Sequence, residues 1–287
     1  MTRKKPANMA ASVRQRLLNK ARAEKRPFNE LLQYFAMERF LYRLSRSPQA
    51  DKFVLKGALM LRAWQTPLSR PTMDIDMLAR QINNEINQII DQVRNICSVP
   101  VESDGLQFDL KSIQGKRIVE DADHEGIRVS FFGKLDTAKI KMQIDIGFGD
   151  TVVPGPQEMV LPTILNFPPP LLICYSRESA IAEKFETMIK LGELNSRMKD
   201  FYDIWLLARQ FNFEGQQLQK ALTETLNNRG TNVTDEITAF SDNFVQNKSS
   251  QWKAFRNKLK IDIIPTEFGD VVAVIRKFIV PITEKIR

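Results

Sequence analysis

The sequence predicts an α+β fold in which a mixed sheet with flanking helices precedes a helical C-terminal region. Short runs of alternating apolar residues between residues 105 and 149, bounded by glycine or charged turn residues, are typical of strands. Six prolines within residues 154–170 mark an extended connector, and the pattern that follows is helical. We therefore predict N-terminal helices with a basic arm at 1–50, a sheet-containing core at 51–170 and a helical domain at 171–287.

The first half of the chain supplies the helices and strands of the predicted core. Apolar residues at helical spacing predict one helix through Val13–Ala21 and a second that begins at Pro27 and extends to Leu44. A strand-like start followed by a helical pattern predicts a short helix at 55–64, and alternation predicts a strand at 73–78. A further helix is expected at 83–96, and three more strands at 106–113, 127–132 and 140–148.

The C-terminal region is predicted to contain five helices. The first begins near Glu178 or Ser179 and has Ile181, Phe185 and Met188 on one side. The others are expected at about 199–210, 214–228, 236–258 and 267–286.

The composition is that of a globular protein. Hydrophobic residues make up 43% of the 287 residues, enough to bury a sizeable core. Cys97 and Cys174 lie in apolar surroundings without paired or metal-ligand spacing, which is typical of a reducing compartment. No apolar run approaches the roughly 20 residues of a membrane span, and the N-terminus lacks the apolar core of a secretory signal. We expect a cytoplasmic protein with no membrane contact.

The net charge of +8 is concentrated at the N-terminus. Residues 1–26 contain nine lysines and arginines against Glu24 alone, so this segment carries the excess of the whole chain. A basic arm of this kind attracts a polyanion such as RNA. The alternative is a solvated helix face on a mobile terminus.

Three aspartates are the candidate metal ligands. Asp74 and Asp76 are separated by one residue on a predicted strand, so their side chains point the same way and can hold a hard cation such as Mg²⁺. Asp145 lies in another predicted strand, where a carboxylate is costly to bury without a cation or a donor. Asp145 would help to bind a second metal ion or take the proton from an attacking hydroxyl, and the sequence leaves both roles open.

Residues near the aspartates indicate a bound NTP. Gly57 stands where an apolar run meets a helical pattern, and backbone N–H groups at the start of that helix would face the triphosphate. Thr72 would hydrogen-bond a phosphate oxygen, while Arg70 would support the strand or approach the nucleotide. Carboxylates, a metal ion and an NTP together predict a nucleotidyltransferase.

A second group of charged residues lies in the predicted helical region. On a helical wheel Asp200 falls within the apolar arc of its helix, so its carboxylate should be buried and should need a cation. Lys184, at the edge of the apolar stripe of the preceding helix, is the best candidate for that cation. The pair would place Lys184 against the triphosphate, or it would be a structural ion pair between two helices.

Two neighbours of Asp200 receive different predictions. Asp203, at the margin of the same arc, is expected to cap the helix or to pair with Arg197 or Lys199. Tyr202 falls on the opposite side of the wheel and is expected at the surface or in an interface.

Five motifs, taken together, resemble one known protein family. They are Leu55-Lys56-Gly57-Ala58, Arg70-Pro71-Thr72-Met73-Asp74-Ile75-Asp76, Asp145, Lys184 and Lys199-Asp200-Phe201-Tyr202-Asp203. The chain resembles the AbiEii/AbiGii toxin family of nucleotidyltransferases over about residues 30 to 210. Many members of that family have Gly-Gly or Gly-Ser where this chain has Gly57-Ala58.

The resemblance implies both a fold and an activity. The fold is a polymerase-beta-like core with a helical C-terminal region. The activity is magnesium-dependent transfer of a nucleotide from an NTP, in related toxins onto the acceptor end of tRNA, and the partner is the cognate antitoxin of a type IV abortive-infection system active in phage defence. On this resemblance Thr72 and Asp74 carry over as nucleotide and metal residues, Lys184 as a phosphate contact and Asp200 as the downstream catalytic acid.

Two other functions stay open at this point. A nucleotidyltransferase can also modify a protein hydroxyl, and a catalytically silent module could bind nucleic acid through the basic arm. The intact set of Asp74, Asp76, Asp145 and Lys184 argues against the silent module, because a dead enzyme has no reason to retain buried carboxylates.

Overall fold

The chain forms two compact units in its structure, a computed structural model that describes residues 8–66, 70–120, 124–234, 236–259, 261 and 263–286. Unit 1 comprises Met1–Gln65, Pro71–Gly149 and Glu158–Cys174. Unit 2 comprises Thr66–Arg70, Asp150–Gln157 and Tyr175–Arg287.

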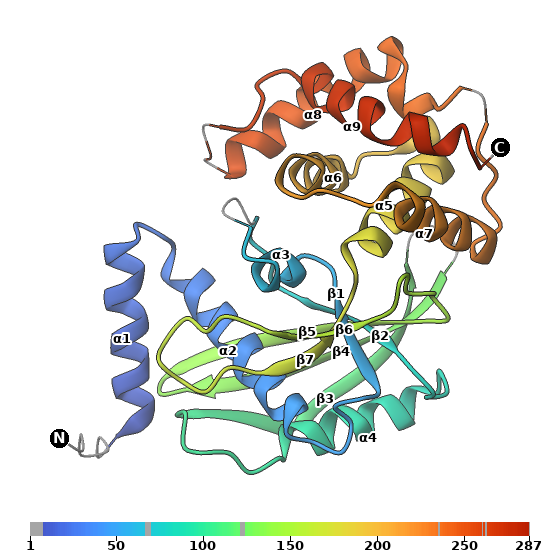
Figure 1. Cartoon of the computed structure of the whole chain (residues 1–287). Helices are drawn as coiled ribbons and strands as arrows, with labels where there is room; N and C mark the ends of the chain where they lie inside the picture. Colours follow the sequence, from blue (N-terminus) through green and yellow to red (C-terminus); the bar gives the residue numbers. More distant parts are fainter. Residues whose placement is uncertain are drawn as a thin grey trace. The chain divides into compact units, whose positions relative to one another are not determined.

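Unit 1 is built on a seven-stranded mixed sheet (Figure 1). Its strands are β1 (Phe53–Lys56), β2 (Ile75–Ala79), β3 (Leu106–Glu120), β4 (His124–Leu135), β5 (Ala138–Phe148), β6 (Gln157–Val160) and β7 (Leu171–Cys174). They lie in the order β3-β4-β5-β2-β1-β7-β6. β2 runs parallel to β5 and β1 parallel to β7, whereas β1–β2, β3–β4 and β4–β5 are antiparallel. The predicted α+β class, a mixed sheet with flanking helices, is confirmed.

The helices of unit 1 are α1 (Met9–Ala23), α2 (Phe28–Ser45), α3 (Leu59–Ala63) and α4 (Ile86–Cys97). Helices α2 and α4 pack on the same face of the sheet. From α2, the ring of Phe40 lies 6.1 Å from that of Phe108 in β3 and 5.8 Å from that of Phe131 in β4. A Cβ on Gly115 of β3 would come within 2.9 Å of Ile86 in α4, so the helix and strand touch closely there. The polar and charged residues of β4 and β5 alternate onto the opposite face, which we call the open face.

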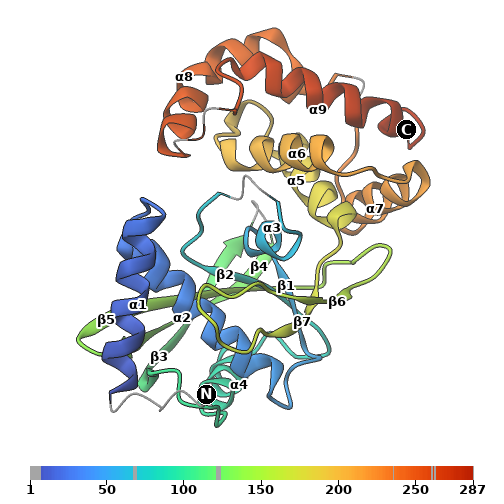
Figure 2. The same cartoon turned by 60° about the vertical axis from the view of Figure 1, so that its left-hand side comes forward.

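Helix α1 carries most of the basic N-terminal segment and lies beside α2 in both views (Figures 1 and 2). The side chain of Asn8 caps it by accepting a hydrogen bond from the backbone N–H of Ala11 at 3.0 Å. Its buried residues are Val13, Leu17 and Ala21. Residues 9–23 of the predicted basic arm therefore form a packed helix, and residues 1–7 of that arm lie outside the described part of the chain.

Strands β6 and β7 are not predicted from the sequence. β6 interrupts the proline-rich connector, and β7 pairs with β1 through Leu55 and Cys174. Each has only four residues, too few to establish a period of two. In β7 the burial alternates, with Leu171 exposed and Leu172 and Cys174 buried, but all four residues are apolar, so the sequence shows no alternation.

Unit 2 consists mainly of helices. They are α5 (Arg177–Leu191), α6 (Met198–Gln210), α7 (Gly215–Asn228), α8 (Asp242–Leu259) and α9 (Phe268–Thr283). The Ser176 hydroxyl caps α5 by accepting a hydrogen bond from the N–H of Ser179 at 3.1 Å, so this helix begins slightly earlier than predicted. Among the described residues, no helix is both long and apolar enough to cross a membrane.

The prediction that Tyr202 lies at a surface is wrong. Tyr202 is fully buried, with its ring centre 5.8 Å from those of both Trp205 and Phe255. The helical wheel assumes that a helix buries one side. In the structure α6 is in contact with α5, α8 and α9. Little of the surface of α6 is therefore exposed to solvent.

Glu38, in α2, is a buried carboxyl group whose pKa is raised. It is 3% exposed; its Oε2 accepts a hydrogen bond from the N–H of Ile164 at 2.6 Å, and its Oε1 lies 3.1 Å from Nε of Arg39. Burial raises the pKa of Glu38 to about 7, although the Arg39 charge opposes the rise. A carboxyl group that is easier to protonate in the folded state makes stability depend on pH.

We predict that Glu38 lowers the stability of the protein as the pH rises. Because its folded pKa of about 7 lies above the ordinary 4.5, the stability it contributes is complete below pH 4.5 and lost as the pH passes 7. Glu38→Gln keeps an acceptor for Ile164 and cannot titrate. Between pH 5 and 8 the unfolding free energy of the wild type should fall by about 2–3 kcal/mol relative to Glu38→Gln, as measured by urea unfolding. Parallel pH profiles would contradict this.

Candidate active site

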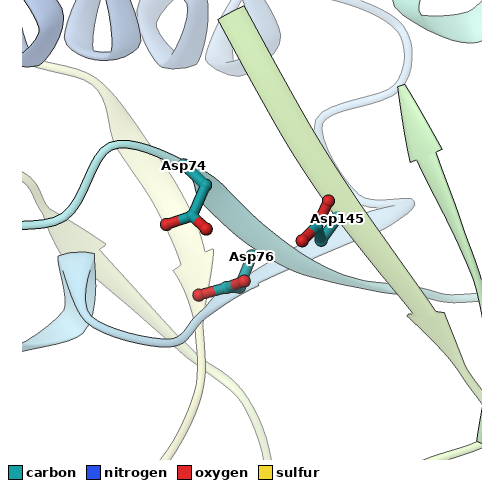
Figure 3. A group of neighbouring side chains, drawn as sticks. All are labelled: Asp74, Asp76 and Asp145. Carbon is teal, nitrogen blue, oxygen red and sulfur yellow. The ribbon is translucent and has the colours of Figure 1, made fainter. Parts of the chain in front are cut away.

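Asp74, Asp76 and Asp145 converge in unit 1 (Figure 3). Asp74 immediately precedes β2, Asp76 lies within β2, and Asp145 lies in the neighbouring parallel strand β5. One carboxylate oxygen from each lies within 4.8 Å of the others. Three oxygen ligands at this separation are suited to a hard divalent cation.

The sheet register explains why two of these aspartates meet. Asp76 is the register partner of Asp145 across the β2–β5 pair. The same row continues to Lys56 in β1 on one side, and to Arg128 in β4 on the other. Neighbouring strands are about 4.8 Å apart, so the row places two adjacent carboxylates between two cations. This order offsets part of the repulsion between the carboxylates.

Arg128 binds Asp145 directly, a contact that the sequence analysis does not predict. Its Nε and Nη2 donate to the two oxygens of Asp145 at 2.8 and 2.7 Å, a bidentate pair. Asp145 is 7% exposed, so the buried carboxylate has the donor that its position requires. The alternation of side chains between the two faces of the strand around Arg128 could have predicted this pair. Once β4 and β5 are paired as a hairpin, that alternation places Arg128 on the same face of the sheet as Asp145.

Gly57 is required by the position of Asp76. It has φ +71°, in the left-handed region that favours glycine, and a Cβ there would lie 1.9 Å from Oδ2 of Asp76. The following residue, Ala58, has φ −69° and needs no such freedom, so the absence of a second glycine is structurally tolerated. The expected phosphate cradle at this turn stays a prediction, and α3 after it has only five residues.

Helix α2 holds the segment that carries Asp74. The Tyr34 hydroxyl accepts a hydrogen bond from the N–H of Thr72 at 3.0 Å. The Gln33 amide donates to the carbonyl oxygens of Met73 and Lys141, each at 3.0 Å, and so links this segment to β5. The Thr72 hydroxyl donates to Oδ1 of Asp74 at 2.5 Å, which makes Thr72 a support for the carboxylate in this state.

A second charged cluster lies in unit 2, around Lys184. Its ammonium contacts Asp200 and Asp203, each at 2.9 Å. Asp200 also accepts from Arg197 at 2.5 Å, and Asp203 is held in a bidentate pair by Arg70 at 2.8 and 2.9 Å. The expected Lys184–Asp200 contact is present. The expected partners of Asp203 are not, because Arg70 and Lys184 take both of its oxygens.

The cluster is deeply buried and its charges stabilise one another. Both aspartates are at most 1% exposed. Burial alone would raise the pKa of Asp200, but Lys184 and Arg197 hold it well below its usual range. Burial would likewise lower the pKa of Lys184, but Asp200 and Asp203 raise it above its ordinary value. The cluster belongs to unit 2 and the three aspartates to unit 1, so a joint site with Lys184 stays a prediction.

Removing Lys184 should destabilise the fold even without any ligand. Lys184→Met would leave two buried carboxylates with one cation fewer, and we expect a loss of about 3 kcal/mol in unfolding free energy, measured by urea unfolding. Lys220→Met is the control, since Lys220 in α7 is exposed and its nearest carboxylate is 3.8 Å away. That control should change stability by no more than about 0.5 kcal/mol. Equal, small effects would show that the cluster contributes little to folding.

Comparison with known proteins identifies the family. A sequence profile described as "Nucleotidyl transferase AbiEii toxin, Type IV TA system" matches residues 39–274, which extends the resemblance into α9. No curated protein sequence matches the chain.

Two solved structures from Helicobacter pylori are among those that match the chain. One, named as a candidate nucleotidyltransferase, has 14% identity and a TM-score of 0.48, covering 89% of this chain and 95% of the other. The second, JHP933, has 13% identity and a TM-score of 0.46, covering 89% and 92%. On the profile match over most of its length, this chain belongs to the AbiEii family of nucleotidyl transferase toxins of type IV toxin–antitoxin systems.

Proposed function

We propose that this enzyme transfers a nucleotide from an NTP to an RNA acceptor, with tRNA as the expected acceptor, and that it requires Mg²⁺. The observation that carries the proposal is the convergence of Asp74, Asp76 and Asp145, with oxygens within 4.8 Å of one another. Adjacent carboxylates of this kind repel one another unless a cation is shared between them.

The donor set fits magnesium. Mg²⁺ is bound through a few carboxylates together with substrate phosphates, and all three groups here offer oxygen ligands. When bound, the ion would offset the charge that develops on the attacking and leaving oxygens. Asp74, Asp76 and Asp145 are the residues that would hold it.

The transfer is a substitution at the α-phosphorus of the NTP. The acceptor hydroxyl oxygen forms a new bond to that phosphorus, the bond to the bridging oxygen breaks, and pyrophosphate leaves. The hydroxyl proton must pass to a base. Asp145 is the candidate base or a further metal ligand, and Arg128 fixes the direction of its carboxylate in either role.

Lys184 is the proposed phosphate contact from unit 2. Its ammonium has three donors, of which two are directed at Asp200 and Asp203. Asp200 then acts by positioning Lys184. Gly57 and Thr72 are proposed to lie beside the nucleotide, with Gly57 also giving Asp76 its space.

The family supports the remaining elements of the proposal. A type IV toxin implies a cognate antitoxin as its protein partner, and we propose a cytoplasmic role in abortive infection and phage defence. A protein hydroxyl as acceptor is the alternative within the same chemistry.

Asp74→Asn should separate metal binding from folding. The asparagine oxygen can still accept from Thr72, but one negative charge is lost from the group of three. We predict that the rise in melting temperature on adding Mg²⁺ with NTP is lost and that transfer falls at least about 100-fold, whereas the melting temperature without ligand is unchanged or higher. Asp109→Asn, at an exposed aspartate of β3, is the matched control and should behave as wild type. Full transfer by Asp74→Asn would reject the assignment.

The acceptor is identified by labelling. Wild type, Asp74→Asn and Asp109→Asn are each incubated with α-labelled NTPs, Mg²⁺ and either total tRNA or cell protein. We expect label in RNA with the wild type and Asp109→Asn, and none with Asp74→Asn. Label in protein would replace RNA by a protein acceptor, and no label in either would reject the proposed transfer.

A further inference from the structure

The open face of the sheet carries lysines that the proposed chemistry does not use. Lys139 and Lys141 of β5 lie on the same side of their strand as Asp145, because residues two apart share a face. Lys134 of β4 is the direct register partner of Lys139. We call Lys134, Lys139 and Lys141 the lysine patch. All three are exposed, and within the described part of the chain none has an ion-pair partner.

The fold does not account for the lysine patch. Like charges directly opposite each other destabilise an antiparallel pair, and Lys134 faces Lys139 in this way. Lysines often protect the exposed edge of a sheet, but β4 and β5 are both interior strands. The ammonium of Lys139 lies 3.7 Å from the ring centre of Phe132, which holds the charge on the open face. An anionic partner would offset the repulsion between these lysines.

We propose that the lysine patch binds the sugar–phosphate backbone of the RNA acceptor and leads its attacking hydroxyl to Asp145. This inference rests on the proposed function and adds the surface by which the acceptor is held. Lys141 and Lys139 are four and six residues from Asp145, or about 13 and 20 Å along an extended strand, so a nucleic-acid strand a few nucleotides long can span the distance.

The lysine patch lies on the same face of the sheet as Asp145, and this placement favours RNA over an acidic protein as the ligand of the patch. A protein inhibitor has no need to reach the carboxylates, whereas the hydroxyl of an acceptor must. The same face carries Lys116 in β3, the register partner of Arg128, so positive charge continues on the far side of Asp145. A basic surface that tracks toward a reacting group is typical of single-strand binding.

The test is a charge-neutral variant with a matched control, both in the full chain. The patch variant combines Lys134→Gln, Lys139→Gln and Lys141→Gln. The control combines Lys220→Gln, Lys258→Gln and Lys277→Gln, which removes the same charge from exposed positions on α7, α8 and α9. Binding of fluorescein-labelled total tRNA and of a fluorescein-labelled single-stranded oligoribonucleotide is measured by anisotropy over a series of KCl concentrations.

We expect the patch variant to bind tRNA at least about tenfold more weakly and the slope of log K against log salt to decrease in magnitude by about 2, because three phosphate contacts are lost. The KM for tRNA should rise while the KM for NTP and the Mg²⁺-NTP thermal shift stay as in the wild type. The control should match the wild type. The patch variant should also be as stable as the wild type or more so, since its like-charge pair is gone.

Equal affinity and slope for the patch variant and the control would overturn the inference, while continued labelling of tRNA would leave the proposed function standing. Unchanged tRNA binding by the patch variant, together with weaker labelling of cell protein than by the control, would also overturn it, in favour of a protein-docking surface. Wild-type enzyme that labels protein and does not bind tRNA would overturn both.

Discussion

The register between β2 and β5 is the constraint on which the candidate site depends. It makes Asp76 and Asp145 direct neighbours and places Lys56 and Arg128 on either side of them. Because side chains alternate between faces, a slip of one residue would turn Asp145 toward the helices and bring Ile144 to the open face. Ile144 and Ile146 are fully buried, so the apolar face fixes the register and thereby fixes the carboxylates. The chemistry is therefore held in place by the hydrophobic core beneath it.

Helix α2 fixes the positions of the residues just outside the sheet. It is almost entirely buried, and it includes polar residues whose burial would be unfavourable without partners. Gln33 and Tyr34 find those partners in the backbone around Asp74 and in β5, at distances of 3.0 Å. The hydrogen bonds that make these residues compatible with a core thus also fix the direction of a candidate metal ligand. Such support from a rigid element is what a site with clustered charges needs.

The sequence predicts the local parts of this arrangement and misses the parts that depend on distant contacts. The two-residue spacing of Asp74 and Asp76 and the wheel position of Asp200 are local patterns, and the structure has both. The bidentate pair of Arg70 with Asp203 joins residues 133 positions apart, and no spacing rule reveals it. Tyr202 is misplaced for a related reason, since a wheel describes one helix and not the helices that cover it. The Arg128–Asp145 pair could be inferred only after the hairpin register is known.

Charged residues in this protein fall into two groups that have different physical explanations. Arg229, for example, is 2% exposed in its side chain and contacts Glu186 at 3.0 Å and Asp150 at 2.9 Å; such a network satisfies buried charge and holds unit 2 together. Lys134 and Lys139 are exposed, adjacent and of the same sign, so their mutual repulsion opposes folding slightly, and neither has an ion-pair partner among the described residues. Paired, buried charge can be explained by the fold alone, whereas exposed charges of the same sign on neighbouring strands do not stabilise each other, and a ligand of opposite charge would offset their repulsion. By this criterion Arg229 belongs to the charges that stabilise the fold, whereas Lys134 and Lys139 are the ones for which we propose a ligand.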